Sequence, residues 1–195
     1  LEYAMVLCLT GLACAIGARV GIFNVGGEGQ LYLGAIVSAY IGVLLKDASP
    51  VLAVLAAALG AVAIGGFYAW IPGVLKVKLK VNEVITTIMM NSIAIFLCAY
   101  LSSGPWKTSH SNRVSGTDTL SQNLQFDKLI PGSNLTTAIF ASMIIAFLVW
   151  YIMGKTTKGY EMRLVGENPR FARYAGIKAS RLMILGMVIS GAICG

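Results

Sequence analysis

Polar side chains recur at helical spacing inside one apolar run of this chain, where an unpaired polar group is costly. Glu83, Thr87 and Asn91, with the small residues Ala94 and Cys98, fall within an arc of roughly 80° at about 100° per residue. An amide in such a run needs a hydrogen-bonding partner. The pattern fits either a bond that holds two helices together or a lining that binds a passing polar solute. Both interpretations stay open for Asn91.

The segment Phe23–Gln30 (FNVGGEGQ) places two amides and a carboxylate among three glycines. It predicts a sharp turn or a broken helix at the edge of an apolar run. A nucleotide-binding glycine loop is excluded because no soluble βαβ context surrounds the segment. Glu28 suits the first turn of a following helix, where its charge favours the helix dipole, or it takes part in gating. The candidate residues for a solute pathway are Asn24, Glu28, Gln30, Thr87 and Asn91.

The segment Gly166–Ile177 (GENPRFARYAGI) predicts a helix of about two turns. Asn168 is a suitable N-cap, Pro169 suits the first helical position, and Gly176 is a natural stop. Two turns are not stable alone, so the exposed side chains need a surface to bind. The candidate contact residues are Glu167, Asn168, Pro169, Arg170, Phe171, Arg173, Tyr174 and Gly176. Either a groove in a partner protein or an anionic membrane surface fits them.

Other chemistry has little support in the sequence. The only histidine, His110, has no HExxH partner, the four cysteines share no metal-ligand spacing, and no G-x-x-x-x-G-K-[ST] loop is present. We therefore expect no catalytic residue, metal or cofactor in this chain. The basic pI of about 9.4 does not indicate nucleic acid, since the charges lie beside apolar runs.

Long apolar runs must position these residues. Hydrophobic residues make up 57% of the chain and charged residues 12%. Three charge-free runs exceed the roughly 20 residues that cross a bilayer as a helix: Val51–Leu75, Val84–Trp106 and Leu129–Gly154. Shorter candidates are Gly29–Leu45, Tyr3–Ala18 and Leu182–Gly195. The pattern predicts an all-α, polytopic transmembrane bundle with about six segments.

Small residues recur every four positions in two of these runs and predict close helix packing. One series is Ala53, Ala57, Ala61, Gly65 and Ala69, and the other is Gly34, Ser38 and Gly42. We assign these smooth faces to structure and not to chemistry.

The basic stretch Lys155–Arg181 sets the expected orientation. It has seven basic and two acidic residues, a net charge of +5, out of +7 for the whole chain. Short basic loops stay on the cytoplasmic side of a membrane. Residues 155–181 are therefore the predicted cytoplasmic loop. Alternation places residues 102–134 outside, and Arg19 and the Lys76–Lys80 cluster inside.

Three stretches together resemble the permease subunits of bacterial ABC importers for nucleosides and simple sugars, a family related to the branched-chain amino acid permeases. They are Phe23–Gln30, Asn82–Asn91 (NEVITTIMMN) and Gly166–Ile177, and the ending Ile189–Gly195 (ISGAICG) also matches. One position departs from the pattern, because Gly27 stands where Ala or Val is more usual. The resemblance implies that residues 1–195 form a single transmembrane permease domain, as an internal fragment of a longer protein.

The resemblance also implies partners and a location. A pair of cytoplasmic ATPase subunits would bind ATP and Mg²⁺, a second permease subunit would complete a homo- or heterodimer, and an external lipoprotein would deliver the substrate. Residues 168–174 would be the coupling helix that docks on the ATPase. The chain would thus be a transport subunit and not an enzyme, embedded among lipids in a bacterial plasma (inner) membrane.

The likeness is greater to the nucleoside importers than to the ribose or galactose permeases, which remain the alternative. An ion-coupled secondary transporter is a second alternative, but it usually needs an ionisable group at mid-membrane, whereas Glu28 and Glu83 lie at the edges of spans. A membrane enzyme is disfavoured by the isolation of His110.

Overall fold

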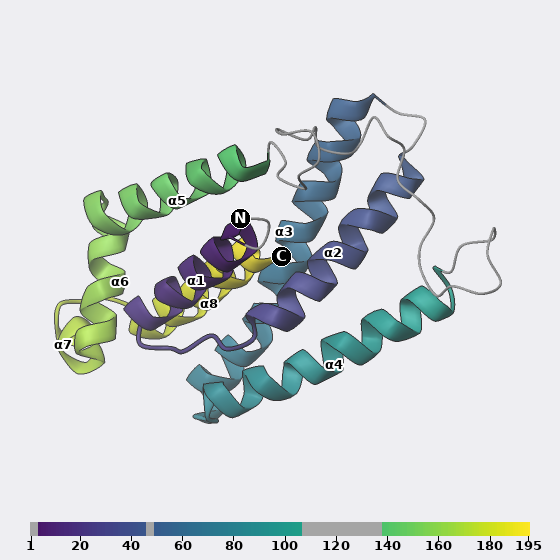
Figure 1. Ribbon diagram of the computed structural model, residues 1–195. Helices are drawn as coiled ribbons and strands as arrows, with labels where there is room; N and C mark the ends of the chain where they lie inside the picture. The colour runs from purple at the N-terminus through teal and green to yellow at the C-terminus, as the bar shows by residue number, and fades with distance from the viewer. Residues whose placement is uncertain (1–3, 46–48, 107–137) are drawn as a thin grey trace.

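A computed structural model describes residues 4–45, 49–106 and 138–195, and these residues form helices and no strand. The all-α prediction is confirmed. Within these ranges, eight α-helices and one π-helical turn follow one another (Figure 1). Their bounds are α1 Ala4–Arg19, α2 Gly27–Leu44, α3 Pro50–Val74, η1 Leu75–Leu79, α4 Glu83–Ser103, α5 Ala138–Lys155, α6 Thr157–Glu167, α7 Pro169–Tyr174 and α8 Ala179–Cys194.

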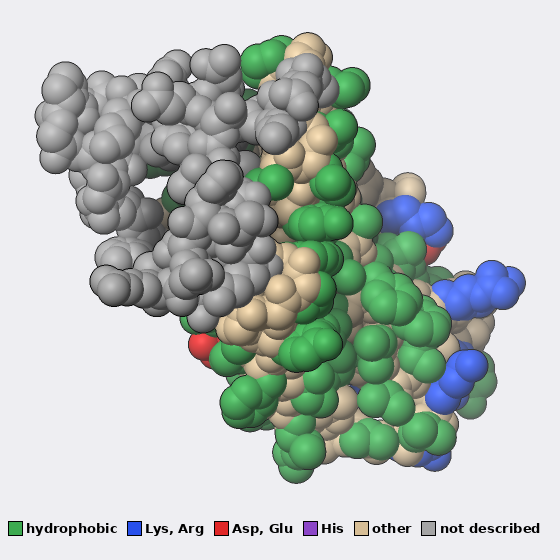
Figure 2. Space-filling view, turned by 90° about the vertical axis from the view of Figure 1, so that its right-hand side faces the viewer, with side chains coloured by type: hydrophobic (Ala, Val, Ile, Leu, Met, Phe, Trp, Pro, Cys, Tyr) green, Lys and Arg blue, Asp and Glu red, His purple; other side chains and the backbone are tan. Residues whose placement is uncertain are grey.

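Six of these helices correspond to the six apolar runs. Three are long and apolar enough to cross a membrane, namely Pro50–Leu79, Glu83–Ser103 and Ala138–Lys155, while α1 and α8 are shorter apolar helices. Large hydrophobic side chains lie exposed on the long helices, including Phe96 and Phe147. Figure 2 shows broad hydrophobic surface on one face, with Lys and Arg gathered at its edge. A surface of this kind suits lipid as its solvent.

The helices pack in a connected order around α3 and α8. Helix α8 lies against α3 and α1, α2 lies against α3 and α4, and α5 meets the rest mainly through α1 and α6 (Figure 1). The small residues Ala53, Ala61, Gly65 and Ala69 of α3 are buried. A Cβ built on Gly65 would overlap the backbone of Gly191 in α8. The predicted smooth face is confirmed, and α8 is the helix that it brings close.

The connections that carry basic residues share one end of the bundle. Pro72 lies inside α3, which continues into the π-helical turn carrying Lys76 and Lys78. Lys80 then ends the turn in the left-handed region at a φ of 55°. At the same end, the connection between α1 and α2 approaches α6, since a Cβ on Gly21 would lie 3.3 Å from Gly166 Cα. The predicted alternation of loops across the membrane, and the side that this end faces, stay predictions.

The contact between α3 and α8 yields a stability prediction. Gly191→Ala places a methyl group against Ala69 and the backbone of Gly65, so the helices must move apart. We expect a loss of about 1–3 kcal/mol in the free energy of unfolding in detergent, as for other overpacked cores. The matched control is Gly11→Ala in α1, where nothing lies within 4 Å of the added Cβ. Equal unfolding temperatures for the two variants would contradict this packing.

Candidate functional site

Asn24 is the centre of a buried polar cluster in the connection between α1 and α2. Its Nδ2 donates to Ser190 Oγ of α8 at 2.8 Å and to Gln30 Oε1 of α2 at 3.1 Å. Ser190 Oγ in turn donates to the carbonyl of Ala13 in α1 at 2.6 Å. The Asn24 Oδ1 accepts from Gly26 N at 2.9 Å and from Gln30 Nε2 at 3.2 Å. These bonds tie three helices to one short connection.

Asn91 fastens α4 to the same region. Its Oδ1 accepts from Gly29 N at 3.0 Å, and its Nδ2 donates to the carbonyl of Val25 at 3.0 Å. A Cβ on Gly29 would lie 2.9 Å from Asn91 Oδ1, so only glycine lets the two helices approach this closely. We call Asn24, Gln30, Asn91 and Ser190, with their partners, the polar junction.

The five residues predicted to line a pathway divide into two groups. Asn24, Gln30, Thr87 and Asn91 are buried. Their polar atoms bond within the chain, and the Thr87 hydroxyl donates to the carbonyl of Glu83 at 2.7 Å. Glu28 is exposed in the first turn of α2. The bonds of Asn91 correspond to its helix-joining interpretation, and a pathway role for the five residues stays a prediction.

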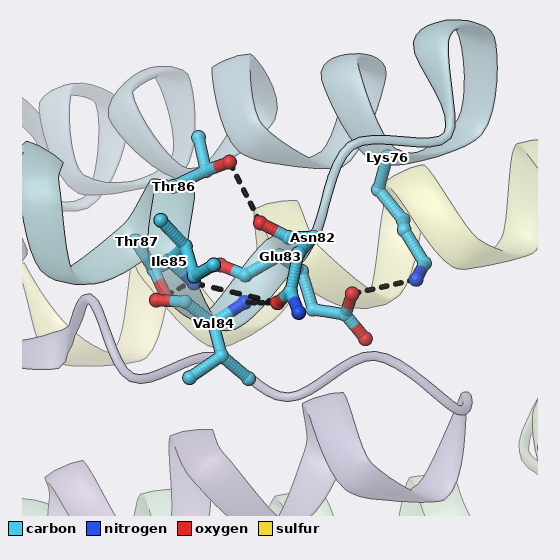
Figure 3. A network of polar contacts seen from close by, with 7 residues as sticks. All are labelled: Lys76, Asn82, Glu83, Val84, Ile85, Thr86 and Thr87. Carbon is cyan, nitrogen blue, oxygen red and sulfur yellow. Dashed lines mark hydrogen bonds and ion pairs between the residues drawn. The ribbon is translucent and has the colours of Figure 1, made fainter.

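The start of α4 is held by local bonds that the sequence largely predicted. Asn82 Oδ1 accepts from Val84 N at 2.9 Å and Ile85 N at 3.4 Å, so the predicted N-cap is confirmed (Figure 3). Glu83 lies in the first turn, as expected, and its Oε2 pairs with Lys76 Nζ at 2.6 Å. This pair closes the connection from η1 to α4, and its partner in η1 was not predicted.

The predicted small helix is also present. Asn168 Oδ1 accepts from Arg170 N at 3.1 Å and Phe171 N at 3.0 Å, and Pro169 occupies the first position of α7. Gly176 follows the helix with a φ of +79°, which suits glycine. Phe171 is 56% exposed and Tyr174 92% exposed. Together with Arg170 and Arg173, which are also exposed, they form what we call the coupling surface.

Helix α6 was not predicted from the sequence, because its basic residues indicated a loop over all of Lys155–Arg181 except the small helix. Two features of the sequence indicate this helix, and the structure shows the contacts of both. Thr156 Oγ1 accepts from Gly159 N at 3.1 Å as an N-cap, and the buried residues Gly159, Met162 and Val165 recur every three positions. Glu167, placed among the contact residues, is the last residue of α6 and is exposed.

Ser190 was also missed as a functional group, although the ISGAICG ending that contains it was noted. A serine within an apolar run needs a partner, and that is the signal that could have found it. Within the described ranges, no group of three or more His, Cys, Asp or Glu residues could hold a metal ion. His110 and most of the predicted external loop 102–134 lie outside the described residues.

Comparisons with known proteins give a consistent result. The family described as "Branched-chain amino acid transport system / permease component" matches residues 1–195. The guanosine ABC transporter permease protein NupP of Bacillus subtilis is 36% identical over 96% of this chain and 54% of its own length. The nucleoside ABC transporter permease protein NupB of Lactococcus lactis is 34% identical over 97% of this chain and 54% of its own.

A glucose ABC transporter permease protein of Haloferax volcanii is 32% identical over 97% of this chain and 52% of its own length. The chain thus spans about half the length of the curated relatives that it matches. No solved structure matches it.

The polar junction yields a prediction that separates its two interpretations. Asn24→Ala leaves the Gln30 amide and Gly26 N without a partner and removes the donor to Ser190 Oγ, so we expect the free energy of unfolding in detergent to fall by about 2–3 kcal/mol. Ser38→Ala is the control, because the Ser38 hydroxyl bonds only to Ala35 of its own helix. If Asn24→Ala kept the stability of the control but lost transport, Asn24 would be a pathway residue instead.

Proposed function

The chain belongs to the family of branched-chain amino acid transport system permease components, and we propose that it acts in the permease subunit of an ATP-driven importer of nucleosides. The helical membrane architecture and the relatives named as ABC transporter permeases support this proposal. The observation that carries it is the coupling surface: a capped two-turn helix with two exposed aromatic and two arginine side chains, beside the bundle.

A nucleoside is the preferred substrate class. The two relatives at 36% and 34% identity are named for guanosine and nucleosides. A simple sugar is the alternative, since the relative at 32% identity is named for glucose. In either case an external binding lipoprotein would deliver the solute to the outer face, and a second permease subunit would complete the pathway. The chain would lie in a bacterial inner membrane with residues 155–181 in the cytoplasm.

The coupling surface is well suited to a groove in a cytoplasmic ATPase. Aromatic and arginine side chains contribute most of the binding energy at many protein interfaces. Tyr174 is almost fully exposed, while Ala172 on the opposite face is fully buried. Asn168 and Pro169 fix where the helix begins and Gly176 where it ends, so its exposed face is presented in one orientation. ATP and Mg²⁺ would be bound by the partner and not by this chain.

A buried cluster offers a route from this surface into the bundle. Ala172 of α7 belongs to one apolar cluster with Met162 and Val165 of α6, Val20 of the α1–α2 connection and Leu182 of α8. Close-packed interiors transmit displacement, so movement of α7 would reach the polar junction through its neighbours. Closure of the ATPase pair would in this way switch the permease between outward and inward openings.

The coupling surface yields a binding prediction. Phe171→Ala combined with Tyr174→Ala removes both aromatic anchors, so we expect the ATPase to be lost, or retained more than about tenfold more weakly, in co-purification from detergent. Tyr160→Ala is the matched control, because Tyr160 is a 58% exposed aromatic on the neighbouring helix α6. The variants should reach the membrane at the level of the parent protein.

Two outcomes would contradict this assignment. If the double variant still co-purified with the ATPase at the parent level but no longer bound anionic vesicles, α7 would be an interfacial membrane helix. Uptake that survives depletion of ATP but collapses with the proton gradient would instead favour an ion-coupled transporter.

The substrate class is tested separately. We expect the cognate binding protein to bind guanosine or adenosine, as measured by calorimetric titration. Ribose and glucose should bind at least about a hundredfold more weakly, because polar groups that bond to a nucleobase are left unpaired when the ligand has no base. Binding of a sugar with no binding of any nucleoside would select the sugar alternative.

A further inference from the structure

A cavity of about 310 Å³ lies between α1, α5 and α6, away from both the polar junction and the coupling surface. Its walls are apolar and come from two helices: Leu12 and Ile16 of α1, and Val149, Trp150 and Met153 of α5. Both helices run toward α6 (Figure 1). Each helix therefore contributes an apolar strip that leads to the same end of the bundle.

Two arginines lie at that end of the cavity. Arg19 is exposed in the last turn of α1, and Arg163 of α6 donates one N–H to the carbonyl of Met153. A guanidinium has five N–H donors, so Arg163 keeps others for a further acceptor. Over the described ranges, the ion pairs join Lys76 to Glu83 and Lys158 to Glu161, and neither involves these arginines. The end of the cavity thus carries two positive charges.

The lining matches an amphipathic anion. Residues 12, 16 and 19 follow one face of α1, and the rise along the helix from residue 12 to residue 19 is about 10 Å. A soluble anion such as inorganic phosphate would use the arginines and leave this apolar strip empty. A phospholipid would use both parts, and Trp150 is a residue type that gathers at membrane surfaces. Two guanidiniums favour a headgroup of net negative charge over a zwitterionic one, whose own cation they would repel.

We propose that this cavity binds an anionic phospholipid, with its phosphate at Arg19 and Arg163 and an acyl chain along the apolar strips of α1 and α5. The proposal rests on the membrane orientation given under the proposed function, with α6 on the cytoplasmic side. Because α5 meets the bundle mainly through α1 and α6, the lipid would help to fix α6, and with it α7, against α1.

The test uses the full-length protein in detergent and counts bound phosphatidylglycerol by native mass spectrometry. Phosphatidylcholine with identical acyl chains is the comparison, because its zwitterionic headgroup has no net charge. We expect the parent protein to retain phosphatidylglycerol preferentially, and Arg19→Gln and Arg163→Gln each to weaken retention about fivefold. Lys155→Gln is the matched control: it removes the same charge from the last turn of α5, next to the cavity but outside its lining.

A variant that leaves both arginines in place tests the apolar part. Ala15 lines the cavity, so Ala15→Phe should fill it and displace the lipid, whereas excess inorganic phosphate should not. Equal loss in Lys155→Gln, displacement by phosphate, or no preferential retention by the parent would overturn the proposal. Co-purification of the ATPase, measured on the same samples, reports separately on the proposed function.

Discussion

The break between α1 and α2 sets the main physical constraint on this bundle. Buried backbone groups cannot bond to water, so those freed where a helix ends must find partners inside the protein. Asn24 and Asn91 supply them: Asn24 accepts from Gly26 N, and Asn91 bonds both Gly29 N and the Val25 carbonyl. In the described part of the chain, no buried side-chain N or O lacks a partner. The connection can be irregular because four helices surround it with matching groups.

Close packing and polar bonding depend on each other in this arrangement. Ser190 reaches Asn24 only if α8 lies near the α1–α2 connection, and the overlap-free approach of Gly65 to Gly191 allows α8 to lie there. Gly27 of α2 is another glycine that lies close to α8. A Cβ there would stand 3.1 Å from Cys194 Sγ, which gives a local reason for glycine at a position where the resemblance led us to expect Ala or Val. Small residues therefore set the distances at which the polar bonds form.

Local chemistry was predictable from the sequence and long-range pairing was not. The caps at Asn82 and Asn168 follow from rules that act within a few residues, and both are present. The partners of Asn91 lie more than 60 positions away, and Ser190 lies 166 positions from Asn24. The sequence showed that such groups need partners without showing which ones. The π-helical turn after α3 was also not predicted from the sequence.

The hydrogen bonds of the polar junction restrict which helices can move relative to one another. Separating Asn24 from Ser190, or Asn91 from Gly29, would leave amides unpaired away from water, which is more costly than sliding apolar surfaces past one another. The helices joined there should therefore move largely as one unit. In the proposed importer, change between openings would then fall to contacts without such bonds, above all those of α5, which meets the bundle mainly through α1 and α6. Since α5 contacts α6 and α6 leads directly into α7, the loosely attached helix is linked to the coupling surface through α6.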